Sequence, residues 1–267
     1  MPVVNARMYS VSPRVKNAWQ RLLHWVLDDA QLAWEVVDHD APAPLSAMWA
    51  RGDLGLAMMC GLPCALRTPP PQVIAAPIPS PARYQGLARY CSDLVVRADA
   101  PFRCLEDTFG GVAAYTVADS MSGAVAFNAH LQAFRSPARP RLYARTVGNL
   151  VNARGVIDAL ARGDVDVGPL DSYYHDLLRQ DAPEYAAQVR TIASTRWTPL
   201  PPLVSTASLS PEVVERLRAS LLRAAQQPDL ASERALLLLA GFAFPDASEY
   251  DLLARISHQS LPPIEEL

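Results

Sequence analysis

The most constraining feature of this sequence is its alternation of strand-like and helix-like segments, because that order is typical of parallel strands joined by crossover helices. A first strand is predicted over Val3–Tyr9. Ser12 then caps a helix that carries Pro13 at its first position, which is a favoured helix start. The first series continues with a strand, a short helix and a strand over Leu32–Val37, Leu45–Ala50 and Leu54–Met59.

A second series of the same kind begins after residue 98. Its predicted strands and helices alternate over Gly111–Val117, Met121–Ala133, Leu142–Val147, Ala153–Ala161 and Val165–Pro169. The two series share letters, since Ala50–Leu54 matches Ala161–Val165 at an offset of 111 residues. In both copies we expect a helix to end at a glycine, Gly52 or Gly163, in the left-handed conformation. The sequence therefore predicts an α/β fold of two similar lobes, each a mainly parallel sheet flanked by helices.

The remaining segments predict how the two lobes are joined. Tyr90–Arg97 leaves the first lobe as a strand-like run, and Pro199–Thr206 returns to it. Further helices, expected after Ser210 and over Leu230–Ala240 and Ala247–Ala254, would pack back on lobe one. We expect a discontinuous lobe one of residues 1–97 and 201–267, a lobe two of residues 98–200, a hinge with two crossings and a ligand cleft between the lobes.

Charge and hydropathy exclude two classes of partner. The 24 basic and 27 acidic residues are mixed along the chain, and no block of Lys or Arg builds a face for nucleic acid. The longest apolar stretches, such as Leu236–Phe242, are far shorter than the ~18–20 residues that span a bilayer. The 24 prolines cluster between the periodic segments, for example at Pro77–Pro81, and predict stiff loops. We expect a monomer that binds no nucleic acid and does not insert into a membrane.

The four cysteines predict neither a metal site nor a compartment. Cys60 and Cys64 have C-x3-C spacing, and no second pair or nearby histidine completes a zinc site. Buried thiols are the expectation for these two and for Cys91 and Cys104, with one disulfide as the alternative in an exported protein. The predicted strand follows Met1 almost at once, without a charged leader, so the chain is either cytosolic or starts at a mature end.

Ligands of open parallel sheets bind beyond the carboxyl ends of the strands, where loops enter helices. That rule selects six segments: Tyr9–Ser12, Cys60–Pro63, Ser80–Tyr84, Asp119–Gly123, Gly148–Asn152 and Asp171–Tyr174. The offset of 111 residues also places Cys60 opposite Asp171, each just after the third strand of its series. We expect these positions to face one ligand.

The most informative of these segments is the turn from Asp119 to Gly123. Ser120 and Ser122 supply hydroxyl donors, and the turn precedes a helix whose first N–H groups are unpaired and whose N-terminus is electropositive. This combination suits a tetrahedral oxyanion such as phosphate, phosphonate or sulfonate. The alternative is that one of the two serines only caps the helix.

The candidate residues near the other strand ends each have more than one reading. Asp171 either pairs with a ligand amine, caps the following helix or bonds across the hinge. Tyr9, Tyr84, Tyr173 and Tyr174 either offer ring faces and phenol groups to a ligand or serve only in packing.

Signatures of catalysis are missing from the sequence. It has no G-x-S-x-G elbow, no phosphate-binding loop of the Walker type, no H-E-x-x-H and no G-x-G-x-x-G. The five histidines are scattered, and His175, which comes nearest to the expected cleft, is interpreted as a helix-surface residue. We expect no catalytic residue, no cofactor and no metal.

These residues resemble a known family, the phosphate/phosphite/phosphonate (PhnD-like) substrate-binding proteins of ABC transporters, which have the type 2 periplasmic binding fold. The similar motifs are Tyr9-Ser10-Val11-Ser12-Pro13 with Trp19, Cys60-Gly61, Ser80 to Tyr84, Asp119 to Gly123 and Asp166 to Ser172. The resemblance implies a small anion held at Ser120–Gly123, with Asp171 and Tyr9 against the rest of the ligand. Together with the strand-end candidates above, the full set of expected ligand-binding residues is Tyr9, Ser10, Cys60, Gly61, Tyr84, Ser120, Met121, Ser122, Gly123, Asp171 and Tyr174.

The resemblance also implies a role and a place for the protein. It would be the solute-binding protein of an ABC-type uptake system, with a permease as partner and a periplasmic location. One departure from the family pattern is Met121, which stands where a second serine or threonine is usual and removes a hydroxyl. Two alternatives stay open: an enzyme on the same bilobal fold, such as a lyase of menaquinone synthesis or a pyrimidine-forming thiamine enzyme, and a cytosolic sensor that has lost its transporter.

Overall fold

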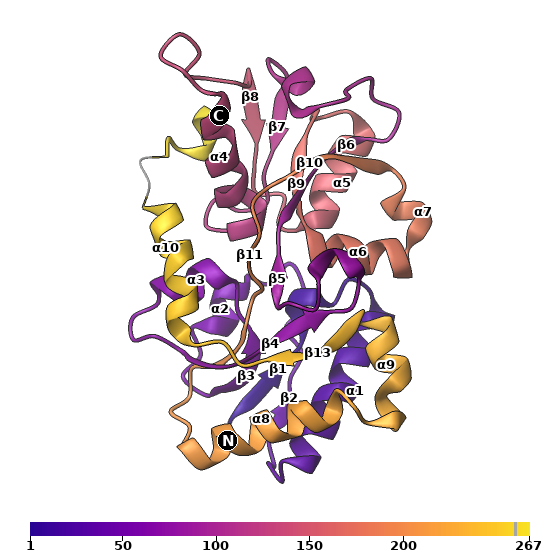
Figure 1. Cartoon of the computed structure of the whole chain (residues 1–267), viewed down its shortest axis with the longest axis vertical. Coiled ribbons are helices and arrows are strands. Elements are labelled where there is room, and N and C mark those ends of the chain that lie inside the picture. The colour runs from indigo at the N-terminus through magenta and orange to yellow at the C-terminus, as the bar shows by residue number, and fades with distance from the viewer. Residues whose placement is uncertain (259–260) are drawn as a thin grey trace. The chain divides into compact units, whose positions relative to one another are not determined.

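The structure is a computed structural model of the chain and describes residues 1–258 and 261–267. It divides the chain into two compact units (Figure 1). Unit 1 comprises Met1–Arg89 and Pro199–Asp251, and unit 2 comprises Tyr90–Thr198 and Leu252–Leu267. The last segment differs from the expected division, which gave all residues after 200 to lobe one. The chain passes between the units after Arg89, after Thr198 and, unexpectedly, after Asp251.

The unit 1 sheet has the strand order β13-β4-β12-β3-β1-β2. Its strands are β1 (Val3–Asn5), β2 (Glu35–Val36), β3 (Leu54–Met58), β4 (Gln72–Pro79), β12 (Leu203–Ser205) and β13 (Leu239–Ala243). β2 and β3 run parallel to β1, whereas β12 is antiparallel to both of its neighbours, β3 and β4. Strands β1, β3 and β4 therefore run in the same direction, and their carboxyl ends lie at one edge of the sheet.

The two long helices of unit 1 begin with the same Ser-Pro pair. In α1 (Pro13–Asp29) the Ser12 hydroxyl accepts a hydrogen bond from the Val15 amide at 3.2 Å. In α8 (Pro211–Ala224) the Ser210 hydroxyl accepts one from the Val213 amide at 3.4 Å. The two helices contact each other and the short α9 (Ala231–Leu236), as Figure 1 shows. Both predicted helix starts are confirmed.

Two predictions that involve β4 are wrong. The helix expected over Leu230–Ala240 ends at Leu236, and β13 follows it and pairs with β4. The prolines at positions 77 and 79 lie inside β4 rather than in a loop. β12 pairs only with Gln72–Ala75, so the half of β4 that carries the prolines is paired with β13 alone. Proline is tolerated there because a strand with one neighbour needs fewer N–H donors than a strand paired on both sides.

A three-stranded and a two-stranded sheet of unit 2, joined by one isolated bridge, also have a common strand edge. β7 (Val112–Ala114) runs parallel to β8 (Arg145–Val147), and Ala113 forms a parallel bridge with Val167, which precedes β9 (Gly168–Asp171). β6 (Ser92–Arg97) is antiparallel to β9 and to β10 (Val189–Ser194). The carboxyl ends of β7, β8 and β9 therefore meet the amino end of β6 at one edge.

Unit 2 carries helices that begin at that edge. A π-helical turn, η4 (Met121–Val125), continues into α4 (Ala126–Leu131), and α5 (Ala153–Arg162) and α6 (Ser172–Asp181) follow β8 and β9. The short helices of the chain are α2 (Leu45–Trp49), α3 (Gly61–Leu66), α7 (Pro183–Ala186) and α10 (Asp251–Ser257), and the short strands β5 (Arg89–Tyr90) and β11 (Thr198–Pro199) lie where the chain leaves and re-enters unit 1.

The repeated glycine behaves differently in the two series. Gly163 ends α5 with a φ of 77°, as predicted for a left-handed cap. The expectation for Gly52 is wrong, because α2 ends at Ala50 with helical backbone angles and Gly52 does not have a positive φ. The long helices α1 and α8 likewise end at alanines, Ala30 and Ala225, with right-handed backbone angles, so a left-handed cap is not required here.

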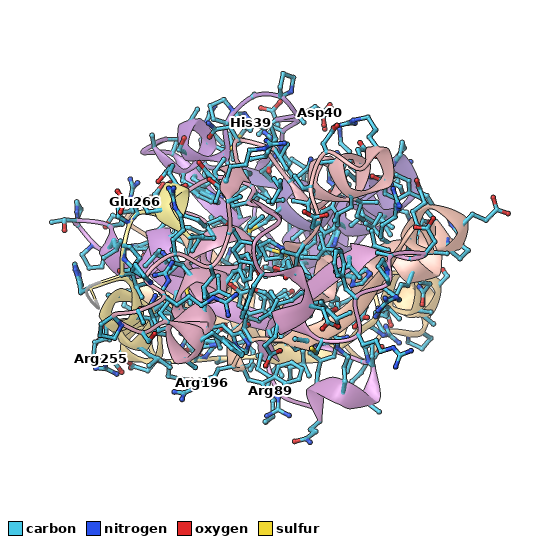
Figure 2. The ribbon with its side chains drawn as sticks, turned by 90° about the horizontal axis from the view of Figure 1, so that it is seen from above. His39, Asp40, Arg89, Arg196, Arg255 and Glu266 are labelled. Carbon is cyan, nitrogen blue, oxygen red and sulfur yellow. The ribbon has the colours of Figure 1, made fainter. Side chains whose placement is uncertain are left out.

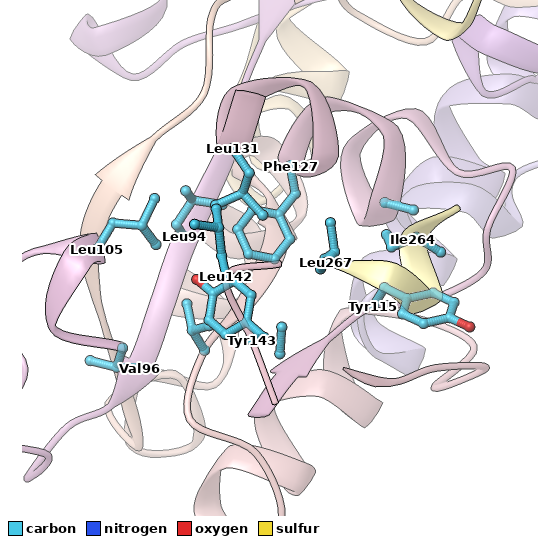
Figure 3. Packing of buried hydrophobic residues seen from close by; sticks show 13 residues of the cluster. Leu94, Val96, Leu105, Tyr115, Phe127, Leu131, Leu142, Tyr143, Ile264 and Leu267 are labelled. Atoms are coloured by element: carbon cyan, nitrogen blue, oxygen red, sulfur yellow. The ribbon is translucent and has the colours of Figure 1, made fainter. Parts of the chain in front are cut away.

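The C-terminal segment belongs to unit 2 because it completes the core of that unit (Figure 3). Ile264 and Leu267 are buried in a cluster with residues from β6, β7, α4 and the segments around them: Leu94, Val96, Leu105, Ala113, Tyr115, Ala124, Phe127, Leu131, Leu142, Tyr143 and Val167. Polar contacts fix the same segment, since the Tyr115 hydroxyl donates to a Glu265 carboxylate oxygen at 3.0 Å. The Asn128 amide donates to the Pro262 carbonyl at 2.8 Å.

The charged side chains are distributed as the mixed sequence pattern predicts. Asp40, Arg196 and Glu266 are exposed and lie at the margin of the view in Figure 2. No helix within the described ranges combines the length and the apolar character that crossing a membrane requires.

Replacing Ile264 by alanine should destabilise unit 2, because its side chain is only 6% exposed within the core cluster. The expected loss in free energy of unfolding is ~2–4 kcal/mol, the usual cost of removing a buried Ile side chain. Urea unfolding monitored by circular dichroism measures this loss. Leu222→Ala is the control, since Leu222 is 49% exposed and its replacement should cost less than ~0.5 kcal/mol. Equal losses in the two variants would contradict the placement of the C-terminal segment.

Candidate functional site

Three of the predicted segments lie at the carboxyl edge of the unit 2 sheet. Thr116–Gly123 follows β7, Gly148–Asn152 follows β8, and Asp171 is the last residue of β9. Since β7, β8 and β9 are parallel, the structure brings these segments to one edge, each at the start of a helix. The segments after β1, β3 and β4 are arranged in the same way in unit 1.

The segment Ser120–Gly123, here called the anion turn, starts the helix η4. The Ser120 hydroxyl oxygen accepts a hydrogen bond from the Gly123 amide at 3.1 Å, so Ser120 is the N-cap. A hydroxyl that accepts this bond still has its own hydrogen to donate. The Met121 and Ser122 amides open the helix and have no carbonyl one turn earlier to bond. Ser120 therefore caps the helix and keeps a donor for a ligand, so the two readings are compatible.

Ser122 and Met121 differ in what they offer to a ligand. The Ser122 side chain is partly exposed, and its hydroxyl makes no hydrogen bond to any residue that the structure describes. Met121 is 1% exposed, so its side chain belongs to the interior of unit 2 and only its backbone amide remains as a donor. The turn thus presents two hydroxyls and two amides, none of which carries a formal charge.

Gly123 is required by the close packing of the anion turn on the end of β7. A Cβ atom at this position would lie 1.9 Å from the Thr116 Oγ1 atom and 2.9 Å from the Ser120 hydroxyl oxygen. The same close approach lets the Thr116 amide donate to the Gly123 carbonyl at 3.1 Å. Any larger residue at position 123 would push the turn away from Thr116.

Asp171 acts as the N-cap of α6, which was one of its predicted alternatives. One of its carboxylate oxygens accepts hydrogen bonds from the Tyr173 amide at 2.9 Å and from the Tyr174 amide at 3.0 Å. Burial raises the pKa of the Tyr174 phenol above its usual value, although the nearby Arg154 guanidinium opposes this rise. Tyr174 is therefore protonated at neutral pH and retains a hydrogen-bond donor. Tyr173 is fully buried and serves packing.

A group of polar residues lies beneath this edge and was not predicted from the sequence. It consists of Ser92, Asp93, His175, Ser194 and Thr195, here called the β6 polar layer. His175 Nδ1 lies 2.9 Å from an Asp93 carboxylate oxygen, with both side chains almost wholly buried. The other oxygen of Asp93 accepts a hydrogen bond from the Ser194 hydroxyl at 3.2 Å. The interpretation of His175 as a helix-surface residue is wrong, because the side chain is 0% exposed.

A signal for this layer was present in the sequence. Ser92 and Asp93 interrupt the otherwise apolar run Tyr90–Arg97, and polar residues inside such a strand need buried partners. The partners could not be found in the same way, because His175 is 82 residues from Asp93 in the chain.

The unit 1 candidates occupy the equivalent edge of their own sheet. Tyr9 ends the 3₁₀ turn η1 (Arg7–Tyr9), and Tyr84 ends the 3₁₀ turn η2 (Ala82–Tyr84); both side chains are buried. The Ser10 hydroxyl donates to the Ala6 carbonyl at 2.6 Å. Cys60 precedes α3, which begins at Gly61, just as Asp171 precedes α6, so the internal repeat has a structural counterpart.

None of the four cysteines forms a disulfide, and three of them are buried as expected. Burial beside Cys60 raises the pKa of Cys64 to about 12, which keeps that thiol protonated and unreactive. The expectation of burial is wrong for Cys104, which is exposed. Within residues 1–258 and 261–267, no three His, Cys, Asp or Glu side chains gather as a metal site.

Comparisons with known proteins agree with this geometry. The family model described as "ABC transporter, phosphonate, periplasmic substrate-binding protein" matches residues 9–250. No curated protein matches the sequence.

Solved structures show the same fold at low sequence identity. A binding protein component of an ABC phosphonate transporter from Pseudomonas aeruginosa is 18% identical, with a TM-score of 0.78 over 96% of this chain and 85% of that one. PhnD1 from Prochlorococcus marinus, solved in complex with methylphosphonate, is 15% identical, with a TM-score of 0.73 over 96% of each chain. A protein from Xanthomonas citri, solved bound to chloride ion, is 20% identical, with a TM-score of 0.67 over 96% of this chain and 95% of that one.

The predicted fold class is confirmed, since these neighbours have the two-lobed type 2 periplasmic binding fold. The family match spans most of the sequence, from Tyr9 to Tyr250, and includes every predicted site residue. Family membership implies a ligand, an ABC permease as partner and a location outside the cytoplasm. The chain belongs to the phosphonate-binding periplasmic substrate-binding proteins of ABC transporters.

Proposed function

We propose that the protein binds the tetrahedral oxyanion of a phosphonate, phosphate or sulfonate ligand at the anion turn and delivers it to an ABC permease. The observation that carries this proposal is the donor set of the turn. The Ser120 and Ser122 hydroxyls and the Met121 and Ser122 amides open one helix start, where the partial positive charge of the helix favours an anion. Each hydrogen bond to a charged oxygen is worth ~1.5–3 kcal/mol, so a few suffice for binding.

Of the remaining predicted residues, Ser10, Asp171 and Tyr174 are partly exposed and would contact the rest of the ligand. The other unit 1 candidates, Tyr9, Cys60, Gly61 and Tyr84, are buried and would support the strand ends of unit 1 rather than contact a ligand. The methylphosphonate complex of PhnD1, a protein of the same fold, supports a ligand with a phosphonate group. For a family of periplasmic binding proteins, we infer a periplasmic location and a monomer that meets its permease when loaded with ligand.

We also propose that the protein does not transform its ligand. The only buried acid–histidine pair described above is Asp93 with His175, and burial of its ring at 0% exposure keeps His175 from reaching a bound molecule. A histidine acts as a general base only within hydrogen-bond reach of its substrate. The donors of the anion turn are hydroxyls and amides, which bind a charge without activating a nucleophile.

Ser122→Asp should abolish anion binding, because a carboxylate at this position would occupy and repel the ligand's oxygens. The expected loss in affinity for methylphosphonate is about a hundredfold or more, since like charges in contact cost several kcal/mol. Isothermal titration calorimetry measures it. Ser46→Asp is the matched control: Ser46 is also the second residue of a helix, α2, and is exposed. Wild-type affinity in Ser122→Asp would exclude the anion turn as the site.

Incubation with methylphosphonate should return the ligand unchanged. Phosphorus NMR of the protein with an excess of methylphosphonate is expected to show a free and a bound resonance of one compound over a day at 25 °C. A new phosphorus species that grows with protein concentration would show catalysis and contradict a transport role.

A further inference from the structure

We propose that Ser92 is a positioning residue, which orients the anion turn through a hydrogen bond and does not contact the ligand. This inference rests on the proposed function, since it concerns how the same site is held in a binding geometry. Ser92 lies at the amino end of β6 and is 1% exposed, so no ligand reaches it. Its hydroxyl donates a hydrogen bond of 2.7 Å to the backbone carbonyl of Ser122.

That bond fixes the orientation of a whole peptide unit. The Ser122 carbonyl and the Gly123 N–H belong to one planar peptide, so holding the carbonyl also holds the direction of the N–H. The Gly123 N–H in turn donates to the Ser120 hydroxyl oxygen at 3.1 Å. Ser92 therefore acts through the Ser122–Gly123 peptide on the Ser120 hydroxyl.

This arrangement affects the ligand through the direction in which the Ser120 hydroxyl hydrogen points. A hydroxyl whose oxygen accepts from a fixed N–H has its hydrogen turned away from that donor. In Ser120 the hydrogen is thus left for an outside acceptor, and an oxyanion is such an acceptor. Without the bond from Ser92, the Ser122–Gly123 peptide would be held less firmly, and ligand binding would have to restrict its motion at a cost in affinity.

Ser92 itself is held on both sides by other members of the β6 polar layer. Its amide donates to the Thr195 hydroxyl at 2.9 Å. The next residue, Asp93, contacts His175 of α6 and Ser194 of β10. A residue that positions a binding group must itself be locked by packing and hydrogen bonds, and Ser92 meets this condition.

The amino end of β6 also contacts the start of α6, which is the second helix start of the candidate site. Ser92 pairs with Asp171 in the register of β6 and β9. The neighbouring Cys91 amide donates to the Ser172 hydroxyl at 3.1 Å, and the Ser172 amide donates to the Cys91 carbonyl at 2.9 Å. The amino end of β6 thus supports the anion turn and the start of α6 together, so that a displacement of one would be passed to the other.

The test combines Ser92→Ala with a matched control that loses the same chemistry elsewhere. Ser205 of β12 is also 1% exposed, and its hydroxyl donates to the Leu54 carbonyl at 3.0 Å and the Ala207 carbonyl at 2.9 Å. Its strand partner Gln72 begins β4, so Ser205 lies at the edge opposite the candidate residues of unit 1. We expect Ser92→Ala to weaken methylphosphonate binding by about tenfold to a hundredfold, the scale seen for outer partners of ligating groups. Ser205→Ala should bind as the wild type does.

A second readout needs no ligand. The Gly123 amide in nitrogen–proton correlation spectra should shift in Ser92→Ala and exchange its proton with solvent about tenfold faster or more, because its peptide is released. Ser92→Thr keeps a hydroxyl on the same carbon and should preserve both the Gly123 resonance and the affinity within about threefold. Calorimetry and hydrogen exchange measure these quantities at a temperature at which all variants are folded.

Two results would overturn the role of Ser92: an unchanged Gly123 amide in Ser92→Ala, or a loss of affinity in Ser92→Thr as large as in Ser92→Ala. A wild-type protein that binds no methylphosphonate would instead contradict the proposed ligand class. The Gly123 readout would then still decide whether Ser92 orients the turn.

Discussion

The common direction of β7, β8 and β9 is the constraint on which the rest of unit 2 depends. Parallel strands send the chain into their helices at one edge, and each helix start brings backbone N–H groups that have no partner in the helix. The caps Ser120, Asn152 and Asp171 satisfy some of these groups. In the proposed function, the amides left over at the anion turn are the groups that stabilise the negative charge of the ligand.

Much of this could be predicted from the sequence because it depends on neighbouring residues. The Ser-Pro helix starts and the donor-rich turn before α4 are local patterns, and they appear where they were expected. The strand ends do not, since β1 ends at Asn5 and β7 at Ala114, before the predicted Tyr9 and Val117. β13 was mistaken for the end of a helix, since Leu236–Ala240 is uniformly apolar and only its pairing with β4 decides between the two. The β6 polar layer and the docked C-terminal segment depend on contacts between distant parts of the chain, which no local pattern contains.

Met121 shows how one substitution fits both the family and this structure. The family pattern favours a second hydroxyl at this position, and its loss suggests a weaker site. In the structure the Met121 side chain is buried in unit 2, while its backbone amide stays at the helix start. The turn exchanges one side-chain donor for apolar packing that anchors it, and it retains its backbone donors.

The burial of Ile264 and Leu267 has a consequence for the order of folding during synthesis. Domains of a nascent chain generally fold as units in the order in which they leave the ribosome. Here the residues that complete the unit 2 core emerge only after the second segment of unit 1, Pro199–Asp251. Unit 2 therefore cannot complete its core before that segment has been synthesised. A ribosome-bound chain that ends before Ile264 leaves Tyr115, Phe127 and Tyr143 without part of their apolar cover, which makes such a nascent chain a natural client for chaperones.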